Sequence, residues 1–145
     1  MTAVGLAQFV AVVSSGLALI PAGAHLVLAP AKLSLEPFDY ARAQKLLRGW
    51  PRYGLLGLLA LLSNAGAALL QRNEPGRALL AAAAALASGL GLLLPLLFAW
   101  PADRATERWS DVPVDWRWLR TRWEGSQVAA GALAVLAFLA AATSC

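Results

Sequence analysis

The stretch from Trp100 to Gln127, WPADRATERWSDVPVDWRWLRTRWEGSQ, interrupts an otherwise apolar chain. It holds five of the six tryptophans and ten charged residues, five of each sign, between two long apolar runs. Tryptophan and arginine favour the headgroup level of a bilayer. The stretch therefore marks where the flanking apolar runs leave a membrane. Two roles are open for it, an anchor at the membrane surface or the mouth of a site.

The composition excludes an ordinary soluble domain. The 145 residues are 59% hydrophobic and 14% charged, with a mean hydropathy of +0.62, whereas about a quarter of the residues in a soluble domain are charged. We therefore expect one integral-membrane domain over residues 1–145. The net charge is only +4, and the basic residues flank apolar runs, so lipid headgroups rather than nucleic acid are the expected partner. The single cysteine, Cys145, excludes an internal disulfide.

Four apolar runs predict an all-α fold, a four-helix transmembrane bundle with short interfacial helices in its cytoplasmic loops. The expected spans cover residues 4–29, 53–70, 78–100 and 126–143, and runs of this kind can cross a hydrocarbon core of about 30 Å. Pro37 is placed to begin an interfacial helix that Gly49 and Pro51 would end. From Pro113, the helix of the last span can run unbroken through Trp123 into the membrane.

The basic residues predict the orientation. Four spans place loops 30–52 and 101–125 on one side, and these loops hold ten of the twelve lysines and arginines. By the positive-inside rule, we expect these loops in the cytoplasm and both termini outside, in the cell inner membrane. Whether the chain forms a homo-oligomer stays open.

Stripes of small residues predict which helix faces pack together. Helical spacing places His25 on a stripe with Pro21 and Ser14, and Asn64 on a second stripe near mid-membrane, where its amide needs a hydrogen-bonding partner. The face that carries Arg120, Trp123 and Gln127 continues into Gly131 and Ala134, so it too is expected to look inward. The resulting candidates converge near the ends of the spans: His25, Asp103, Arg104, Trp123, Glu124 and Gln127, with Asn64 deeper. Apolar walls with a few convergent polar groups are typical of a small-molecule pocket.

Each candidate also has a simpler interpretation. His25, the only histidine, is a candidate general base because desolvation favours the neutral imidazole, which accepts protons; it is equally explained as a packing histidine. Arg120 and Glu124 are four residues apart and suit an ion pair on a helix surface. One histidine and one terminal cysteine cannot supply a usual metal-ligand set, so we expect no metal site.

The order of motifs resembles that of the small integral-membrane proteins that include the anthrone oxygenases. The matching elements are His25 in the first span, Pro101-Ala102-Asp103-Arg104 after the third, then Trp109, then the run from Pro113 to Glu124, PVDWRWLRTRWE. The layout covers nearly the whole chain, and its specific part is about 25 residues long. Two positions differ from the pattern. Asp103 stands where many relatives have asparagine, and Gln127 stands where many have histidine.

This resemblance implies a four-helix membrane bundle that oxidises anthrones or similar polycyclic phenols to quinones, with dioxygen as co-substrate and without metal or flavin. It implies a monooxygenase or another base-driven step of polyketide biosynthesis, such as cyclisation. His25 would be the base, Arg104 or Arg120 would hold the developing oxyanion, and Trp123 would be an aromatic wall. The catalytic candidates are then His25, Arg104 and Glu124, and the substrate-binding candidates are Asn64, Trp100, Asp103, Arg120, Trp123 and Gln127.

Two other functions remain open from the sequence. The chain could be a non-catalytic small membrane subunit or scaffold whose tryptophans and arginines only position it at the interface. It could also bind a quinone or a haem. An enzyme requires a cavity that contains His25, and a scaffold does not.

Overall fold

The computed structural model describes residues 2–46, 52 and 54–145, and the regular structure in this part is entirely helical. Three long apolar helices could cross a membrane, and a shorter apolar helix accompanies them. The prediction of an all-α membrane protein is thus confirmed. In chain order the elements are α1 (Ala3–Leu33), α2 (Pro37–Leu46), α3 (Gly54–Leu70), α4 (Pro75–Leu94), the π-helical turn η2 (Pro95–Ala99), α5 (Trp100–Ala105) and α6 (Trp116–Thr143).

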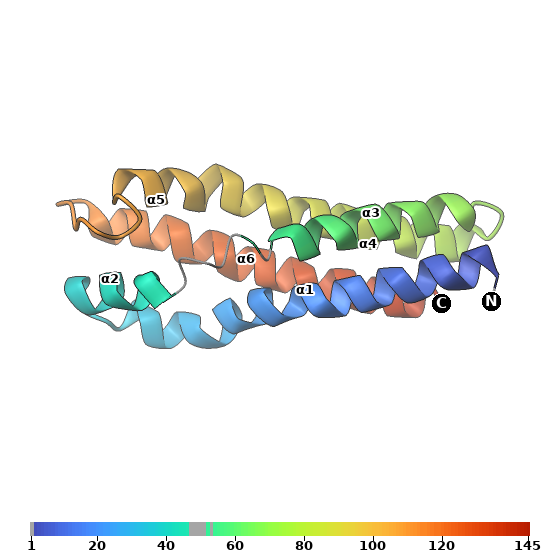
Figure 1. Cartoon of the computed structure of the whole chain (residues 1–145), viewed down its shortest axis with the longest axis horizontal. Coiled ribbons are helices and arrows are strands. Elements are labelled where there is room, and N and C mark those ends of the chain that lie inside the picture. The colour runs from blue at the N-terminus through green and yellow to red at the C-terminus, as the bar shows by residue number, and fades with distance from the viewer. Residues whose placement is uncertain (1, 47–51, 53) are drawn as a thin grey trace.

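The four longest helices form a ring. Helix α1 packs against α3 and α6, and α4 packs against the same two helices. The two termini lie together at one end, while α2 and α5 lie at the other end (Figure 1). At the terminal end, the side-chain amide of Gln8 donates hydrogen bonds to the backbone oxygen of Ser144 at 3.0 Å and to Gln71 Oε1 at 3.3 Å.

The expected small-residue stripes form the contact between α1 and α3. Ser14 and His25 on α1 and Asn64 on α3 are buried. The Asn64 amide donates to Ser15 Oγ at 2.9 Å and to the Ala60 carbonyl at 2.8 Å, and the hydroxyls of Ser14 and Ser63 are 2.7 Å apart. The prediction that Asn64 lies on a packing face and has a hydrogen-bonding partner is confirmed.

Helices α1 and α6 approach each other most tightly at a glycine. A Cβ atom built on Gly131 would lie 2.8 Å from the carbonyl oxygen of Ala22 and 2.7 Å from Leu26 Cγ. Real Cβ atoms do not come this close to backbone oxygen, so only glycine permits this separation of the helices. The small residue expected at position 131 therefore has a direct steric role.

Several helix boundaries differ from the expected spans, and α4 begins at Pro75 rather than at residue 78. Helix α1 continues through Pro30 to Leu33, because a proline removes only one backbone donor and the turn beyond it is closed by the backbone N–H of Ser34. Helix α6 begins at Trp116 rather than at Pro113, and it runs without a break through Trp123 and the last span, as predicted. Helix α2 begins at Pro37 as expected, whereas its expected stop signals, Gly49 and Pro51, and the expected start of the second span at residue 53 lie outside the described residues.

A π-helical turn joins α4 to α5. Pro95 has no backbone N–H, and the N–H of Trp100 bonds back to the Pro95 carbonyl across five residues. The chain stays helical from Pro75 to Ala105. The wider turn changes the rotational phase of the residues that follow it, including Asp103 and Arg104.

Candidate functional site

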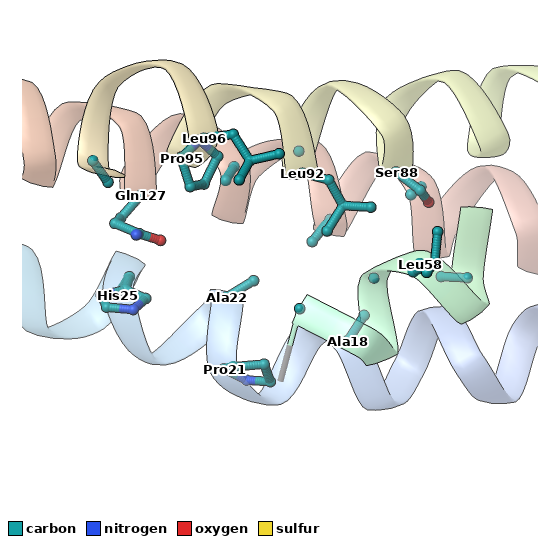
Figure 2. Close-up of a pocket in the computed structure, with 18 of the residues that line it drawn as sticks. Ala18, Pro21, Ala22, His25, Leu58, Ser88, Leu92, Pro95, Leu96 and Gln127 are labelled. Atoms are coloured by element: carbon teal, nitrogen blue, oxygen red, sulfur yellow. The ribbon is translucent and has the colours of Figure 1, made fainter. Parts of the chain in front are cut away.

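A cavity of about 540 Å³ lies between α1, α3, α6 and the α4–η2–α5 helix. Its walls are mainly alanine, glycine, leucine and proline residues. The polar side chains in its described lining are Ser15, His25, Ser88, Asp103 and Gln127. Figure 2 shows His25 on α1 and Gln127 on α6 facing each other across one end of this space, with Pro95 nearby. A large apolar volume with an imidazole, an amide and a carboxyl group near one end suits an apolar molecule that has a polar edge.

Helix α1 places His25 at the cavity wall. The histidine is buried, because it continues the stripe through which α1 meets its neighbours. Its imidazole meets the indole of Trp123 edge to face, with the ring centroids 5.3 Å apart and the ring planes at 68°. Aromatic pairs prefer this arrangement. Trp123 does not line the cavity, and its ring contact fixes the orientation of the imidazole.

Helix α5 places Asp103 at the same end of the cavity. The indole N–H of Trp109 donates to Asp103 Oδ1 at 3.0 Å, which fixes the rotation of the carboxyl group. Trp109 is itself buried against Tyr40, with ring centroids 4.8 Å apart. The tryptophan thus links a polar group of the cavity to helix α2.

A left-handed turn brings Trp109 into this position. Glu107, Arg108 and Trp109 have φ values of 47°, 57° and 61°. Each such residue costs about 1–2 kcal/mol when it is not glycine. The backbone N–H of Arg108 bonds to the Asp103 carbonyl at 2.6 Å, and that of Trp109 bonds to Thr106 Oγ1 at 3.1 Å. These bonds and the burial of the indole offset the strain.

A buried polar cluster lies beyond Trp123, toward the end of the bundle that carries α2. Lys32 Nζ and Glu124 Oε1 form an ion pair at 2.5 Å, with side-chain exposures of 7% and 2%. Glu124 Oε1 also accepts hydrogen bonds from the Tyr40 hydroxyl at 2.8 Å and from the Gln44 amide at 3.2 Å. Burial and the adjacent Glu124 carboxylate raise the pKa of the Tyr40 phenol above its ordinary value, so it remains a donor. We call Lys32, Tyr40, Gln44 and Glu124 the end cluster.

The end cluster connects to the cavity wall through Trp123. Lys32 Nζ lies 4.5 Å from the centroid of the Trp123 ring, on which His25 also packs. Arg120 lies on the outer side of the end cluster. Its guanidinium donates to the Leu35 carbonyl at 3.1 Å, and its Cζ lies 4.6 Å from the centroid of the Trp116 ring. The cluster therefore ties α1, α2 and α6 together directly behind the imidazole.

The structure divides the predicted site residues into three groups. His25, Trp100, Asp103 and Gln127 line the cavity. Trp123 packs behind His25, and Asn64 lies one layer away, bonded to the lining residue Ser15. Glu124 and Arg120 lie in and around the end cluster, and Arg104 is exposed and lies 5.6 Å from the Trp100 ring centroid.

The expected ion pair between Arg120 and Glu124 is not formed. Glu124 pairs instead with Lys32, and Arg120 bonds to a backbone carbonyl. The reason is that Glu124 points into the bundle, where the last turn of α1 supplies a cation. Arg104 likewise does not converge with His25, because its phase on α5 turns it outward.

Sequence reasoning missed Lys32, Tyr40 and Gln44. Lys32 follows His25 and Ala29 at helical spacing, so it shares their face once the helix is extended through Pro30. Tyr40 and Gln44 are four residues apart and share one face of α2, where the Gln44 amide donates to the Tyr40 hydroxyl at 2.5 Å. The spacing of Lys32 was overlooked because the first span was expected to end before Pro30. The spacing of Tyr40 and Gln44 does not show what they contact until the position of α2 is known.

No group of three or more His, Cys, Asp and Glu side chains in the described part of the chain is arranged to hold a metal ion. The described cavity lining offers an imidazole, an amide, a carboxyl group and two hydroxyls beside an apolar volume. Searches with protein-family models, among curated proteins and among solved structures find no match to the chain.

Proposed function

We propose that this chain is a membrane-embedded enzyme that acts on an apolar aromatic molecule by base-driven chemistry at His25. In this proposal α3 is a fourth membrane crossing beside the three longer helices, and the end that carries α2 and α5 faces the cytoplasm. The short length of α3, about 26 Å at helical rise, still approaches the thickness of a hydrocarbon core. The distribution of basic residues supports this orientation.

The observation that carries the proposal is the position of His25 at one end of an apolar cavity of about 540 Å³. A packing histidine would need no adjacent volume. A cavity of this size falls within the range of about 300–1,000 Å³ for small-molecule sites. Its apolar walls favour a ligand that partitions into the bilayer, and the polar side chains at one end favour a ligand with a hydroxyl or carbonyl edge.

The resemblance to the anthrone oxygenases supplies a specific reaction. His25 would take a proton from the activated methylene carbon, and the resulting carbanion would give one electron to dioxygen and then combine with it as a peroxide. Loss of water from the peroxide leaves a carbonyl. The carbon thus loses two hydrogens and gains one oxygen atom, while the second oxygen atom leaves in the water, so no external reductant is needed.

The other lining residues suit supporting roles in this reaction. The Gln127 amide faces His25 across the cavity (Figure 2) and can donate a hydrogen bond to the developing oxyanion. This neutral donor takes the role that the sequence suggested for Arg104 or Arg120, neither of which lines the cavity. Asp103, held by Trp109, can accept a hydrogen bond from a phenolic hydroxyl of the substrate.

The test is turnover of a hydroxylated anthrone in liposomes that contain the purified protein. Oxygen uptake and quinone absorbance should rise together, with one dioxygen consumed for each quinone formed. The variant His25→Gln, which keeps a polar side chain of similar size, should lower the rate by about 10²–10⁴-fold. An unchanged rate in this variant would refute the role of His25.

Two glycines on α3 give a matched pair of variants for the cavity itself. Gly54 lines the cavity, Gly66 does not, and a Cβ at either position meets nothing within 4 Å. Gly54→Leu should weaken binding and turnover, and Gly66→Leu should leave both near the wild-type level. Equal effects of the two substitutions would show that the cavity is not where the substrate binds.

A further inference from the structure

A second hollow, of about 360 Å³, lies on the other side of η2, between this turn and α6. Helices α4 and α6 come close at Gly91, where an added Cβ would lie 3.6 Å from the Ala130 carbonyl oxygen. The hollow begins just beyond this contact. Its described lining is mostly apolar and includes Leu94 and Phe98. We call this hollow the outer groove; the cavity that contains His25 lies on the opposite face of the same turn.

The polar groups of the outer groove differ in their availability. The Thr121 hydroxyl donates to the Arg117 carbonyl at 2.9 Å, and the Ser126 hydroxyl donates to the Trp123 carbonyl at 2.8 Å. Both hydroxyl donors are therefore used by the backbone of α6. The remaining polar groups in the described lining are the Arg122 guanidinium and the indole N–H of Trp118.

Two aromatic rings hold the guanidinium of Arg122 at the groove. Its Cζ lies 4.6 Å from the centroid of the Trp118 ring and 5.4 Å from that of Phe98. Within the described part of the chain, Arg122 has no hydrogen bond or ion pair. Ring contacts engage the charge but supply no acceptor for its five N–H donors. Among the residues that the structure describes, the groove thus presents a fixed cation without an anion beside an apolar channel.

We propose that the outer groove binds an anionic phospholipid. The Arg122 guanidinium pairs with the phosphate, the exposed Trp118 indole lies at the glycerol level, and an acyl chain lies along Leu94, Gly125 and Ala129. Charge complementarity selects the headgroup. A phosphate that carries no ammonium group of its own, as in phosphatidylglycerol, leaves a net negative charge for the single arginine, whereas the choline of a zwitterionic lipid neutralises it.

The experiment is native mass spectrometry of the full chain in detergent, titrated with phosphatidylglycerol or with phosphatidylcholine of the same acyl chains. The wild type should bind the first molecule of phosphatidylglycerol about fivefold more tightly than phosphatidylcholine. Arg122→Gln should abolish this preference. Arg117→Gln is the matched control, because Arg117 also lies near a ring, that of Trp116 at 5.8 Å, but outside the groove, and it should keep the preference.

A second pair of variants tests the acyl-chain part. A Cβ on Gly125 or on Gly23 meets nothing within 4 Å, but only Gly125 lines the groove. Gly125→Leu should weaken binding of both lipids, and Gly23→Leu should not. Inorganic phosphate should fail to displace the lipid, because it cannot use the apolar channel.

Three results would overturn the proposal: a lipid preference that survives Arg122→Gln, an equal loss of the preference in Arg117→Gln, or displacement of the lipid by inorganic phosphate. A fourth is a wild-type dimer that Gly125→Leu abolishes while lipid binding stays unchanged. The last result would assign the groove to a second copy of the chain. None of these results bears on turnover at His25, so this proposal and the proposed function can fail separately.

Discussion

Removal of Glu124 should destabilise the protein much more than removal of its partner Lys32. In Glu124→Gln the shape of the side chain is kept, but the Lys32 ammonium is left buried without a carboxylate. Removing one member of a buried ion pair costs about 3–5 kcal/mol. The Trp123 ring, 4.5 Å from Lys32 Nζ, offsets part of that cost, so we expect a loss of about 3 kcal/mol.

The opposite variant, Lys32→Met, leaves a carboxylate that still has partners. The Tyr40 hydroxyl and the Gln44 amide continue to donate to Glu124 Oε1, and a hydrogen bond to a charged group contributes about 1.5–3 kcal/mol. The expected loss is therefore smaller, about 1–2 kcal/mol. In the double variant neither position carries a buried charge, and replacement of both members of a buried pair is often close to neutral. We expect it to lie within about 1 kcal/mol of the wild type.

The assay is equilibrium unfolding in mixed micelles with increasing sodium dodecyl sulfate, followed by the helical circular dichroism signal. The double-mutant cycle should give a coupling free energy of about 4 kcal/mol between the two positions, which is the sum of the two single losses less the loss in the double variant. The reasoning is refuted if Glu124→Gln costs less than Lys32→Met, or if the two losses simply add in the double variant.

Two further predictions concern the pH dependence of stability and the contact between helices. Because the pKa of Tyr40 is raised in the folded protein, its contribution to stability is complete below pH 10 and should fall above that value by about 1.4 kcal/mol per pH unit. Tyr40→Phe should remove this part of the pH dependence of the unfolding free energy between pH 9 and 11.5. An identical slope in the wild type and the variant would contradict the prediction. Gly131→Ala should destabilise the bundle by about 1–3 kcal/mol, since the new Cβ meets the Ala22 carbonyl oxygen. Gly125→Ala, the control, should be neutral or stabilising by up to about 1 kcal/mol. Equal losses in the same unfolding assay would argue against a tight α1–α6 contact.

Much of the helix packing could be predicted from the sequence, because it depends on local periodicity. Small residues at helical spacing mark the faces that pack, and the structure buries His25, Asn64 and Gly131 on those faces. The inward face of α6 follows from the same rule, since one unbroken helix carries Trp123 and Gly131 at a fixed angle. These predictions require no knowledge of which helix lies opposite.

The end cluster and the direction of Arg104 could not be predicted in this way. Lys32 is buried only because α1 continues past Pro30 and meets Glu124, and Tyr40 reaches the same carboxylate only because α2 folds back onto the bundle. The π-helical turn before α5 changes the phase of every later residue on that helix. Arg104 consequently points outward while Asp103 lines the cavity.

The most direct test of the central claim is an experimental structure in lipid nanodiscs with a hydroxylated anthrone bound. The ligand should occupy the space between α1, α3, α4 and α6, with its reactive carbon or an adjacent oxygen about 3 Å from the His25 imidazole. A ligand found outside this ring of helices, or side chains that fill the space and separate His25 from any ligand, would contradict the claim.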